Sequence, residues 1–200
     1  MTEWTNTDYW VAIVMSLMVA FVVYTLIVAF REGQRDAPEG QIDSLRQKAE
    51  QGYADAQFHL GHAYYFGKGV PQDHKEAAKW FRKAAEQGIA DAQALLGGSY
   101  ALGKGVPQDH TEAAKWYRKA AEQGHAGAQY ALGNAYYHGQ GVPKDSVLAY
   151  MWCNLAAYKL KGEVRENAAE SRDLLAENMT REQIAEAQRL AREWAEKHRK

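Results

Sequence analysis

A long apolar run near the start of the chain gives way to a repeating pattern of apolar and polar positions. The run extends from Tyr9 to Phe30 and contains no charged residue, no glycine and no proline. As a helix it is about 33 Å long, which is enough to cross the hydrocarbon core of a bilayer. We therefore expect residues 1–8 to form a short tail and residues 9–30 to form a transmembrane helix.

The residues on either side of this run predict its orientation. The tail contains Glu3 and Asp8 but no Lys or Arg, and no small-residue cleavage site follows the run. An uncleaved anchor is therefore favoured over a signal peptide. Arg31 and Arg35 follow the run, so the positive-inside rule places the N-terminus outside and the rest of the chain in the cytoplasm. Acidic residues are interspersed with these arginines, and the reverse orientation, with the rest of the chain in the periplasm, stays an alternative.

Within the apolar run, Ala12, Ser16 and Ala20 recur at every fourth residue. Small residues at this spacing let membrane helices approach one another, which predicts weak self-association through the transmembrane helix. Chance produces the same spacing in an apolar run equally well, so this prediction has a simple alternative.

Three blocks of 36 residues follow one another without a gap: residues 49–84, 85–120 and 121–156. The first two blocks agree at 27 of 36 positions, and the third repeats the pattern more loosely. A period of this length is typical of a solenoid, in which each unit buries its apolar face against its neighbours. We expect each block to fold as two helices, which makes the chain all-α. Solenoids of this kind usually bind other proteins.

One apolar stripe predicts the first helix of each block. Within residues 54–66, Gln57, Leu60, Gly61 and Tyr64 are shared by all three blocks, and their i, i+3, i+4, i+7 spacing places them on one helix face. A glycine there costs about 1 kcal/mol relative to alanine, so we expect a neighbouring helix, with its tryptophan as first candidate, to approach Gly61 closely. The positions interpreted as structural are Leu60, Gly61, Tyr64, Trp80, Leu96, Gly97, Tyr100, Trp116, Leu132, Gly133, Tyr136 and Trp152.

Capping residues predict where the second helix of each block begins. Asp73 and Asp109 are N-cap candidates, because aspartate at this position accepts hydrogen bonds from free backbone amides. Glu76 and Glu112 follow three residues later, as in a capping box. In the third block the second helix is more apolar, which predicts that the C-terminal segment covers it.

The segments that flank the blocks are predicted to be a linker and capping helices. Residues 31–41 contain several turn-forming residues and favour a linker. Residues 42–52 align with the second half of a block and predict an N-terminal capping helix. Residues 157–200 are expected to form C-terminal capping helices. These are a helix near Val164–Glu177 and a helix from an N-cap at Thr180 to about Lys197.

Composition narrows the chemistry of the chain. The net charge of −1 gives no electrostatic reason to expect nucleic acid. The single cysteine, Cys153, excludes an intramolecular disulfide and occupies the position of Phe81, which predicts a buried apolar role. His59 and His62 could approach one metal ion, but no third ligand is placed beside them. We expect no metal, no cofactor and no enzymatic activity, with a metal-dependent hydrolase as the remote alternative.

Three motifs recur in the blocks: Ala-x-Ala-Gln-x-x-Leu-Gly, Gly-x-Gly-Val-Pro-x-Asp and Ala-x-x-Trp. With these motifs the chain resembles the Sel-one-like repeat family, a relative of the tetratricopeptide repeat, strongly over residues 49–156 and loosely over residues 42–200. The resemblance implies a right-handed α/α superhelix that serves as a scaffold or adaptor for protein complexes, here at the bacterial inner membrane. Because the chain has one cysteine, it differs from the cysteine-rich secreted members, and their β-lactamase-type or host-directed roles are not implied.

The resemblance also implies that the first helices line the inner surface of the superhelix. Beside the buried stripe, the first and third blocks carry aromatic side chains and the middle block carries small ones. The partner-binding candidates are Phe58, His62, Tyr65, Ala94, Gly98, Ala101, Tyr130, Asn134 and Tyr137. Two interpretations stay open. The aromatics either form the walls of a groove with a central dip that accepts a protein or peptide partner, or fill gaps between adjacent repeats.

Overall fold

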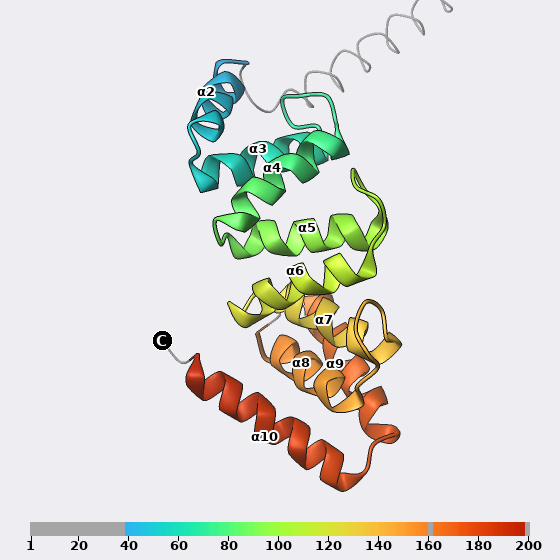
Figure 1. Cartoon of the computed structure of the whole chain (residues 1–200). Coiled ribbons are helices and arrows are strands. Elements are labelled where there is room, and N and C mark those ends of the chain that lie inside the picture. Colours follow the sequence, from blue (N-terminus) through green and yellow to red (C-terminus); the bar gives the residue numbers. More distant parts are fainter. Residues whose placement is uncertain (1–38, 160–161, 199–200) are drawn as a thin grey trace, which may run out of the picture.

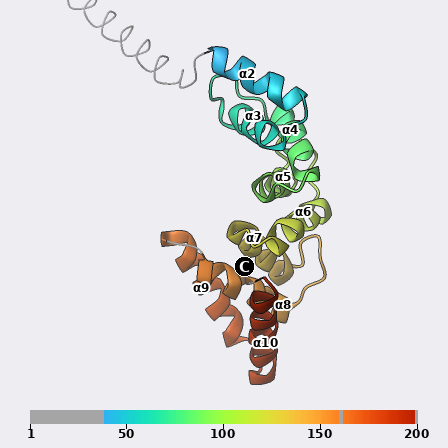
Figure 2. The same ribbon diagram turned by 90° about the vertical axis from the view of Figure 1, so that its left-hand side faces the viewer.

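The structure of the chain is a computed structural model that describes residues 39–159 and 162–198. Both ranges are built from helices joined by short connections (Figure 1). The helices are α2 (Glu39–Glu50), α3 (Ala54–Phe66), α4 (His74–Glu86), α5 (Ala90–Leu102), α6 (His110–Glu122), α7 (Ala126–His138), α8 (Ser146–Lys159), α9 (Gly162–Glu177) and α10 (Arg181–Lys197). They follow one another in a stacked, curved row (Figure 2), and this arrangement confirms the expected all-α repeat solenoid.

The structure describes only part of the N-terminal region for which predictions were made. The transmembrane helix predicted at residues 9–30 and the tail at residues 1–8 lie outside the described residues. In the part of the chain that the structure describes, no helix is long and apolar enough to span a membrane. The capping helix α2 begins at Glu39 and ends at Glu50, so the last residues of the linker expected at 31–41 are helical. Gly40 favoured the linker, but it lies in the first turn, where glycine costs less than in the helix interior.

Each repeat forms a helical hairpin that stacks on the next one. Helices α3 and α4, α5 and α6, and α7 and α8 pack within repeats, whereas α4 packs on α5 and α6 packs on α7 between repeats. The first helices end at Gly67, Gly103 and Gly139, whose φ values are 71°, 67° and 70°. Glycine adopts this left-handed conformation without steric cost, so these residues end the helices and start the loops.

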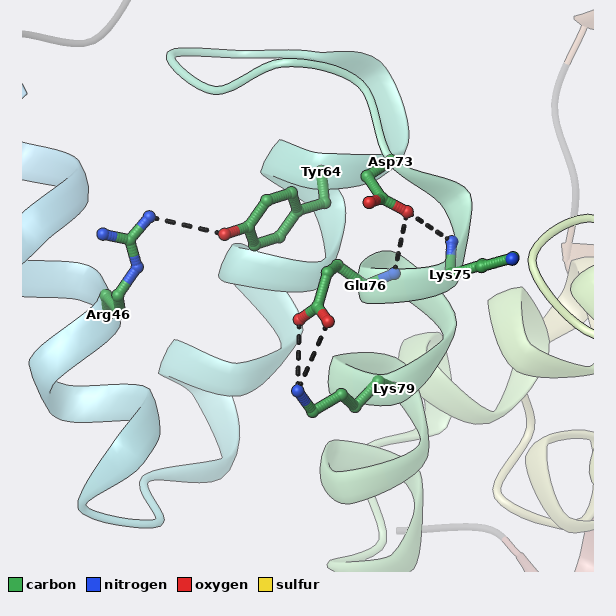
Figure 3. Close-up of polar contacts among 6 residues, drawn as sticks. All are labelled: Arg46, Tyr64, Asp73, Lys75, Glu76 and Lys79. Carbon is green, nitrogen blue, oxygen red and sulfur yellow. Dashed lines mark hydrogen bonds and ion pairs between the residues drawn. The ribbon is translucent and has the colours of Figure 1, made fainter.

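The predicted N-caps of the second helices are confirmed, but the capping box is wrong. The Asp73 Oδ1 atom accepts hydrogen bonds from the backbone amides of Lys75 (2.8 Å) and Glu76 (3.1 Å), as Figure 3 shows. The Glu76 carboxylate does not return a bond to the cap, because it pairs with the Lys79 Nζ atom at 3.3 Å. Asp109 caps α6 in the same way, and Glu112 there pairs with a lysine.

A glycine in each first helix marks the closest approach between the two helices of a repeat. A Cβ atom at Gly61 would lie 2.7 Å from the Phe81 ring and 3.2 Å from the carbonyl oxygen of Ala77. A side chain would fit only if the Phe81 ring moved away, so glycine lets the two helices pack at this distance. Equivalent contacts join Gly97 to Tyr117 and Gly133 to the Sγ atom of Cys153.

The tryptophans lie elsewhere, so the expected tryptophan at the glycine contact is wrong. Trp80 is 6% exposed and belongs to a cluster with Ala49, Ala56 and Leu60, which come from α2 and α3. The glycine instead faces the next residue, Phe81. Successive side chains on a helix point about 100° apart, so adjacent positions serve different neighbours.

Buried glutamines connect each repeat to the one before it. Gln57 lies in the predicted apolar stripe, yet its Nε2 atom donates to the carbonyl oxygen of Ala49 at 3.1 Å. Its Oε1 atom accepts from the Nε2 atom of Gln87 at 2.7 Å. Gln93 and Gln129 make the equivalent bonds to Ala85 and Ala121, at 3.0 Å and 3.2 Å. Buried carboxamides that are hydrogen-bonded in this way specify how neighbouring helices are aligned.

A second polar contact spans the same junctions. The Arg46 side chain in α2 donates to the Tyr64 hydroxyl at 3.3 Å (Figure 3), and Arg118 in α6 donates to the Tyr136 hydroxyl at 2.6 Å. Arg82 donates to Tyr100 in the middle repeat. Arg82 and Arg118 are on second helices and contact the first helix of the next repeat. Arg46 makes the same contact from α2, so α2 occupies the place of a second helix.

The C-terminal helices cover α8, as predicted. Five consecutive residues of α8, from Ala149 to Cys153, are buried, and both α9 and α10 pack against this helix. Helix α9 begins at Gly162, two residues before the expected start at Val164. Thr180 forms the predicted capping box with Gln183 at the start of α10. The outer side of α10 is polar, since Arg189 pairs there with two glutamates.

Neighbouring glycines in α5 provide a matched test of the close approach. Gly97→Ala is expected to destabilise the chain by about 1–3 kcal/mol, because the added Cβ would meet the Tyr117 ring at 2.7 Å. Gly98→Ala is the control, since the nearest atom to its Cβ would lie 3.6 Å away. The control should gain up to about 1 kcal/mol of helix propensity. Thermal and urea unfolding measure both variants, and equal stabilities would contradict the packing.

The Cys153 thiol offers a second test of this packing. Burial raises its pKa to about 12, so the folded chain holds the thiol proton more tightly than the unfolded chain. This contribution to stability is complete below the pKa of an exposed thiol, about 8.5, and is lost as the pH rises through the folded pKa. At pH 8 a disulfide reagent should react roughly 100-fold or more slowly with the native chain than with the denatured chain. Cys153→Ala supplies the background, and equal rates would show that the thiol is accessible.

Candidate functional site

The first helices of the repeats present a surface with little charge. Helices α3, α5 and α7 contain no Lys or Arg, and their only carboxylates are Asp55 and Asp91 in the first turns of α3 and α5. Phe66 and Leu102, the last residues of α3 and α5, are 52% and 64% exposed. Large apolar side chains exposed at equivalent positions of consecutive repeats are a candidate contact area for a partner.

This area continues into the preceding turn of each helix, and we name it the first-helix surface. Its members occupy the last two turns of the first helices: His62, Phe66, Gly98, Leu102, Asn134 and His138. The His62 ring lies 4.4 Å from the Phe66 ring. Partial burial, with Lys68 nearby, lowers the pKa of His62. The imidazole is therefore neutral at neutral pH and adds to the apolar character of the surface.

Phe58 and Tyr65 pack against the ring that fills the space beside Gly61. Their ring centroids lie 6.2 Å and 6.1 Å from that of Phe81, and Tyr65 also lies 5.0 Å from His74. Both side chains are half-buried. These two partner-binding candidates therefore form part of the packing of repeat 1 as well as part of its surface.

In the middle repeat the first helix carries small side chains and the second helix carries the larger one. Ala94 and Ala101 replace the two aromatics, while Tyr117 replaces Phe81 and extends further. Its hydroxyl oxygen would lie 3.6 Å from a Cβ atom at Gly98. Burial raises the pKa of the Tyr117 hydroxyl, which fits its position between repeats. The phenol of Tyr117 thus occupies part of the space expected as a central dip.

In the third repeat the large side chains are on the first helix and the small one is on the second helix. Tyr130 and Tyr137 pack against the cluster that contains the small Cys153. The Tyr130 hydroxyl lies 3.4 Å from the Ser171 Oγ atom, so α9 contacts this residue. Large and small side chains therefore compensate within each of the last two repeats, in addition to any contact that they make with a partner.

Sequence reasoning missed Phe66 and Leu102, because it took position 65 as the outer end of each trio. Tyr65 turns toward α4, whereas the next residue, Phe66, remains on the surface. A signal was present in the sequence. Phe66 lies four residues after His62 and Leu102 lies four after Gly98, and both positions vary between repeats.

A second concave surface lies between α8 and α10. Its volume is about 560 Å³, and its lining includes Leu155, Tyr158, Ala191, Arg192, Trp194 and His198. Tyr158 is 91% exposed, and the rings of Trp194 and His198 stack at 4.2 Å. Sequence reasoning did not predict this cleft, because its walls come from α8 and α10, which are separated along the chain by α9.

The described residues contain no group of three or more His, Cys, Asp or Glu side chains that could hold a metal ion. His59, the other half of the predicted histidine pair, is exposed. Within the described ranges the chain therefore offers a contact surface and a cleft rather than a metal centre.

Comparison with known proteins agrees with this architecture. The Sel1 repeat model matches residues 54–89, 90–125 and 126–159. A protective antigen of uropathogenic Escherichia coli with an SLR fold shares 41% identity over 81% of this chain, with a TM-score of 0.72. The chain spans 34% of that antigen's length. A Sel1 repeat protein from Oxalobacter formigenes shares 42% identity over 64% of this chain and 96% of its own length, with a TM-score of 0.57. No curated protein matches the sequence. The chain belongs to the Sel1 repeat family.

Proposed function

We propose that this chain is a membrane-anchored scaffold that recruits a protein or peptide partner through the first-helix surface. A Sel1 repeat solenoid is a helical scaffold suited to protein–protein interaction. The observation that carries the proposal for this chain is the exposure of Phe66 and Leu102 on helices that contain no Lys or Arg.

The chemistry of this surface indicates the kind of partner. Phe66 and Leu102 offer apolar contact, and the neutral His62 and the small Gly98 lie one turn before them. An amphipathic helix or an extended peptide with apolar side chains fits such a surface. The half-buried candidates Phe58, Tyr65 and Tyr137 support it from within the repeats. Asn134 belongs to the surface itself, and the remaining candidates are Ala94, Ala101 and Tyr130 on the same helices.

Residues 9–30 supply the membrane attachment in this proposal, and the apolar length of that segment supports it. The arginines after Phe30 favour a single-pass protein of the bacterial inner membrane with the N-terminus outside and the repeats in the cytoplasm. Attachment confines the solenoid to the membrane surface and raises the local concentration of a partner that is itself at the membrane. A periplasm-facing scaffold of the cell envelope is the alternative.

We further propose that the chain is not an enzyme. Sel1 repeat proteins are generally interaction scaffolds, and a pair of nearby histidines does not complete a metal site. Metal analysis of the purified chain tests this point. Stoichiometric zinc that survives dialysis against a weak chelator would restore the metal-dependent hydrolase.

The first-helix surface can be tested by crosslinking in cells. A photo-reactive residue at Leu102 should form a covalent adduct with a partner protein, and Phe66→Ser should weaken that adduct several-fold. Because Phe66 is 52% exposed, the substitution should leave the melting temperature nearly unchanged. A photo-reactive residue at Tyr158 is the matched control, since this aromatic is exposed at the α8–α10 cleft. Adducts formed only from position 158 would move the binding site to the cleft.

The anchor and its orientation can be tested with C-terminal reporters. A fluorescent protein that matures only in the cytoplasm should be active in the fusion, and a phosphatase that is active only in the periplasm should be silent. The fusion should pellet with membranes and stay there after alkaline extraction, whereas deletion of residues 9–30 should release it. The opposite reporter pattern would support the periplasmic alternative, and a full-length chain that does not pellet would refute the anchor.

A further inference from the structure

Positive charge is segregated onto the second helices of the first two repeats. Helices α4 and α6 carry seven lysines and arginines, and the first helices α3, α5 and α7 carry none. The seven are Lys75, Lys79, Arg82, Lys83, Lys115, Arg118 and Lys119. The same two helices carry four glutamates and begin after the N-cap aspartates Asp73 and Asp109, so a positive excess of one remains. We name these seven residues the second-helix surface.

The basic residues of α4 line a hollow. Lys75, Lys79, Arg82 and Lys83 are spaced i, i+4, i+7 and i+8, which places them on one face, and all four are exposed. Together with Ala78 and Val106 they line a hollow of about 290 Å³ with no carboxylate in its lining. An anionic group that enters this hollow meets cations on several sides and an apolar floor.

Two of these cations are held in place by aromatic residues, and three of the four have no glutamate partner among the described residues. Lys83 lies 4.2 Å from the centre of the Trp80 ring, and Arg82 donates to the Tyr100 hydroxyl. Glu76 pairs with Lys79, whereas Lys75, Arg82 and Lys83 form no ion pair with a described residue. In α6, Lys119 repeats the contact with a tryptophan, at 4.1 Å from the Trp116 ring. The cationic side chains therefore keep an uncompensated charge in a defined arrangement.

The position of α4 in the solenoid indicates which anion it meets. Helix α4 belongs to the hairpin next to α2, at the end of the row from which the chain continues toward the N-terminus (Figure 1). Eight residues separate the apolar run from Glu39, and eight extended residues reach at most about 29 Å. With the anchor in the membrane, Glu39 therefore lies within about 29 Å of the membrane end of the apolar run, and α4 belongs to the hairpin next to the helix that begins there. Basic side chains near an anionic leaflet are attracted to its phosphates over about one Debye length.

We propose that the second-helix surface lies against the phosphates of anionic phospholipids and holds the solenoid on the bilayer in one orientation. The first-helix surface belongs to the other helix of each hairpin and stays accessible to a partner. This inference rests on the membrane attachment proposed above. It adds to that proposal a lipid-binding surface and a defined orientation of the repeats.

Lysine footprinting of the full chain in lipid nanodiscs tests the proposal. Discs of phosphatidylcholine alone are compared with discs that also contain phosphatidylglycerol. In the anionic discs, acylation of Lys75, Lys83 and Lys119 should slow several-fold, and high salt should restore it. Labelling of Lys68 and Lys144, which lie outside the second-helix surface, should not change. Equal labelling in both kinds of disc would overturn the proposal and leave an acidic protein as the occupant of the surface.

A pair of charge variants separates a specific surface from general attraction. Lys75→Gln with Lys83→Gln should remove the protection of Lys119 in anionic discs, while Lys68→Gln with Lys144→Gln, the matched control, should preserve it. All four lysines are exposed, so both variants should melt like the wild type, which is checked first. If the control also removes the protection, the attraction is general and the proposal fails.

Two further outcomes are distinguishable. A chain that does not co-elute with either disc overturns the anchor, and this inference falls with it. A chain that co-elutes but labels equally overturns this inference alone. Inorganic phosphate added to phosphatidylcholine discs should not protect Lys75 and Lys83. Protection by phosphate would assign the hollow to a soluble anion instead of a lipid.

Discussion

The structure depends on the close approach of two helices at a glycine in every repeat. At Gly61 the ring of Phe81 occupies the space that a side chain would fill, and this contact sets the distance between the two helices of the hairpin. The neighbours on the first helix must then match the residue that fills the space. Phe58 and Tyr65 flank a ring in repeat 1, whereas tyrosines flank a small cysteine in repeat 3. Close packing therefore accounts for much of the variation between repeats that the sequence shows.

Hydrogen bonds between the repeats specify how neighbouring helices are aligned, which apolar packing alone does not. A buried carboxamide has a large cost if its hydrogen bonds are lost, so Gln57 and Gln93 bind the preceding helix in one alignment. Their Oε1 atoms accept from a glutamine 30 residues later, which belongs to the end of the following second helix. The third repeat has Lys159 at that position, and the Gln129 Oε1 atom is buried without a partner among the described residues. The series of glutamine–glutamine hydrogen bonds thus ends at the third repeat, which is followed by α9 and α10 instead of another repeat.

The sequence predicted the elements well, because their signals are local. The 36-residue period, the glycines after the first helices and the aspartates before the second helices each specify a boundary within a few residues. What it could not predict is the direction in which adjacent side chains point. Trp80 and Phe81 differ by one position, as do Tyr65 and Phe66, and only the placement of the neighbouring helix decides which of them is buried against it. Glu76 is a further example. Its carboxylate could bond either to the N-cap amide or to Lys79, and the sequence does not decide between them.

The two helices of a hairpin differ in chemistry, and this difference would let one small solenoid serve both of the proposed roles. A first helix has to accept a side chain of its partner beside a glycine, and in this chain α3 and α5 contain no Lys or Arg and expose Phe66 and Leu102. A second helix supplies that side chain from its inner side, and in the first two repeats its outer side carries lysines and arginines. The ammonium groups of Lys83 and Lys119 lie over the rings of the buried Trp80 and Trp116, so the packing of the tryptophans also positions these charges. Charge on one layer and apolar contact on the other therefore follow from the packing itself. The proposed membrane surface needs cations and the proposed partner needs apolar contact, so the two would not compete for the same residues.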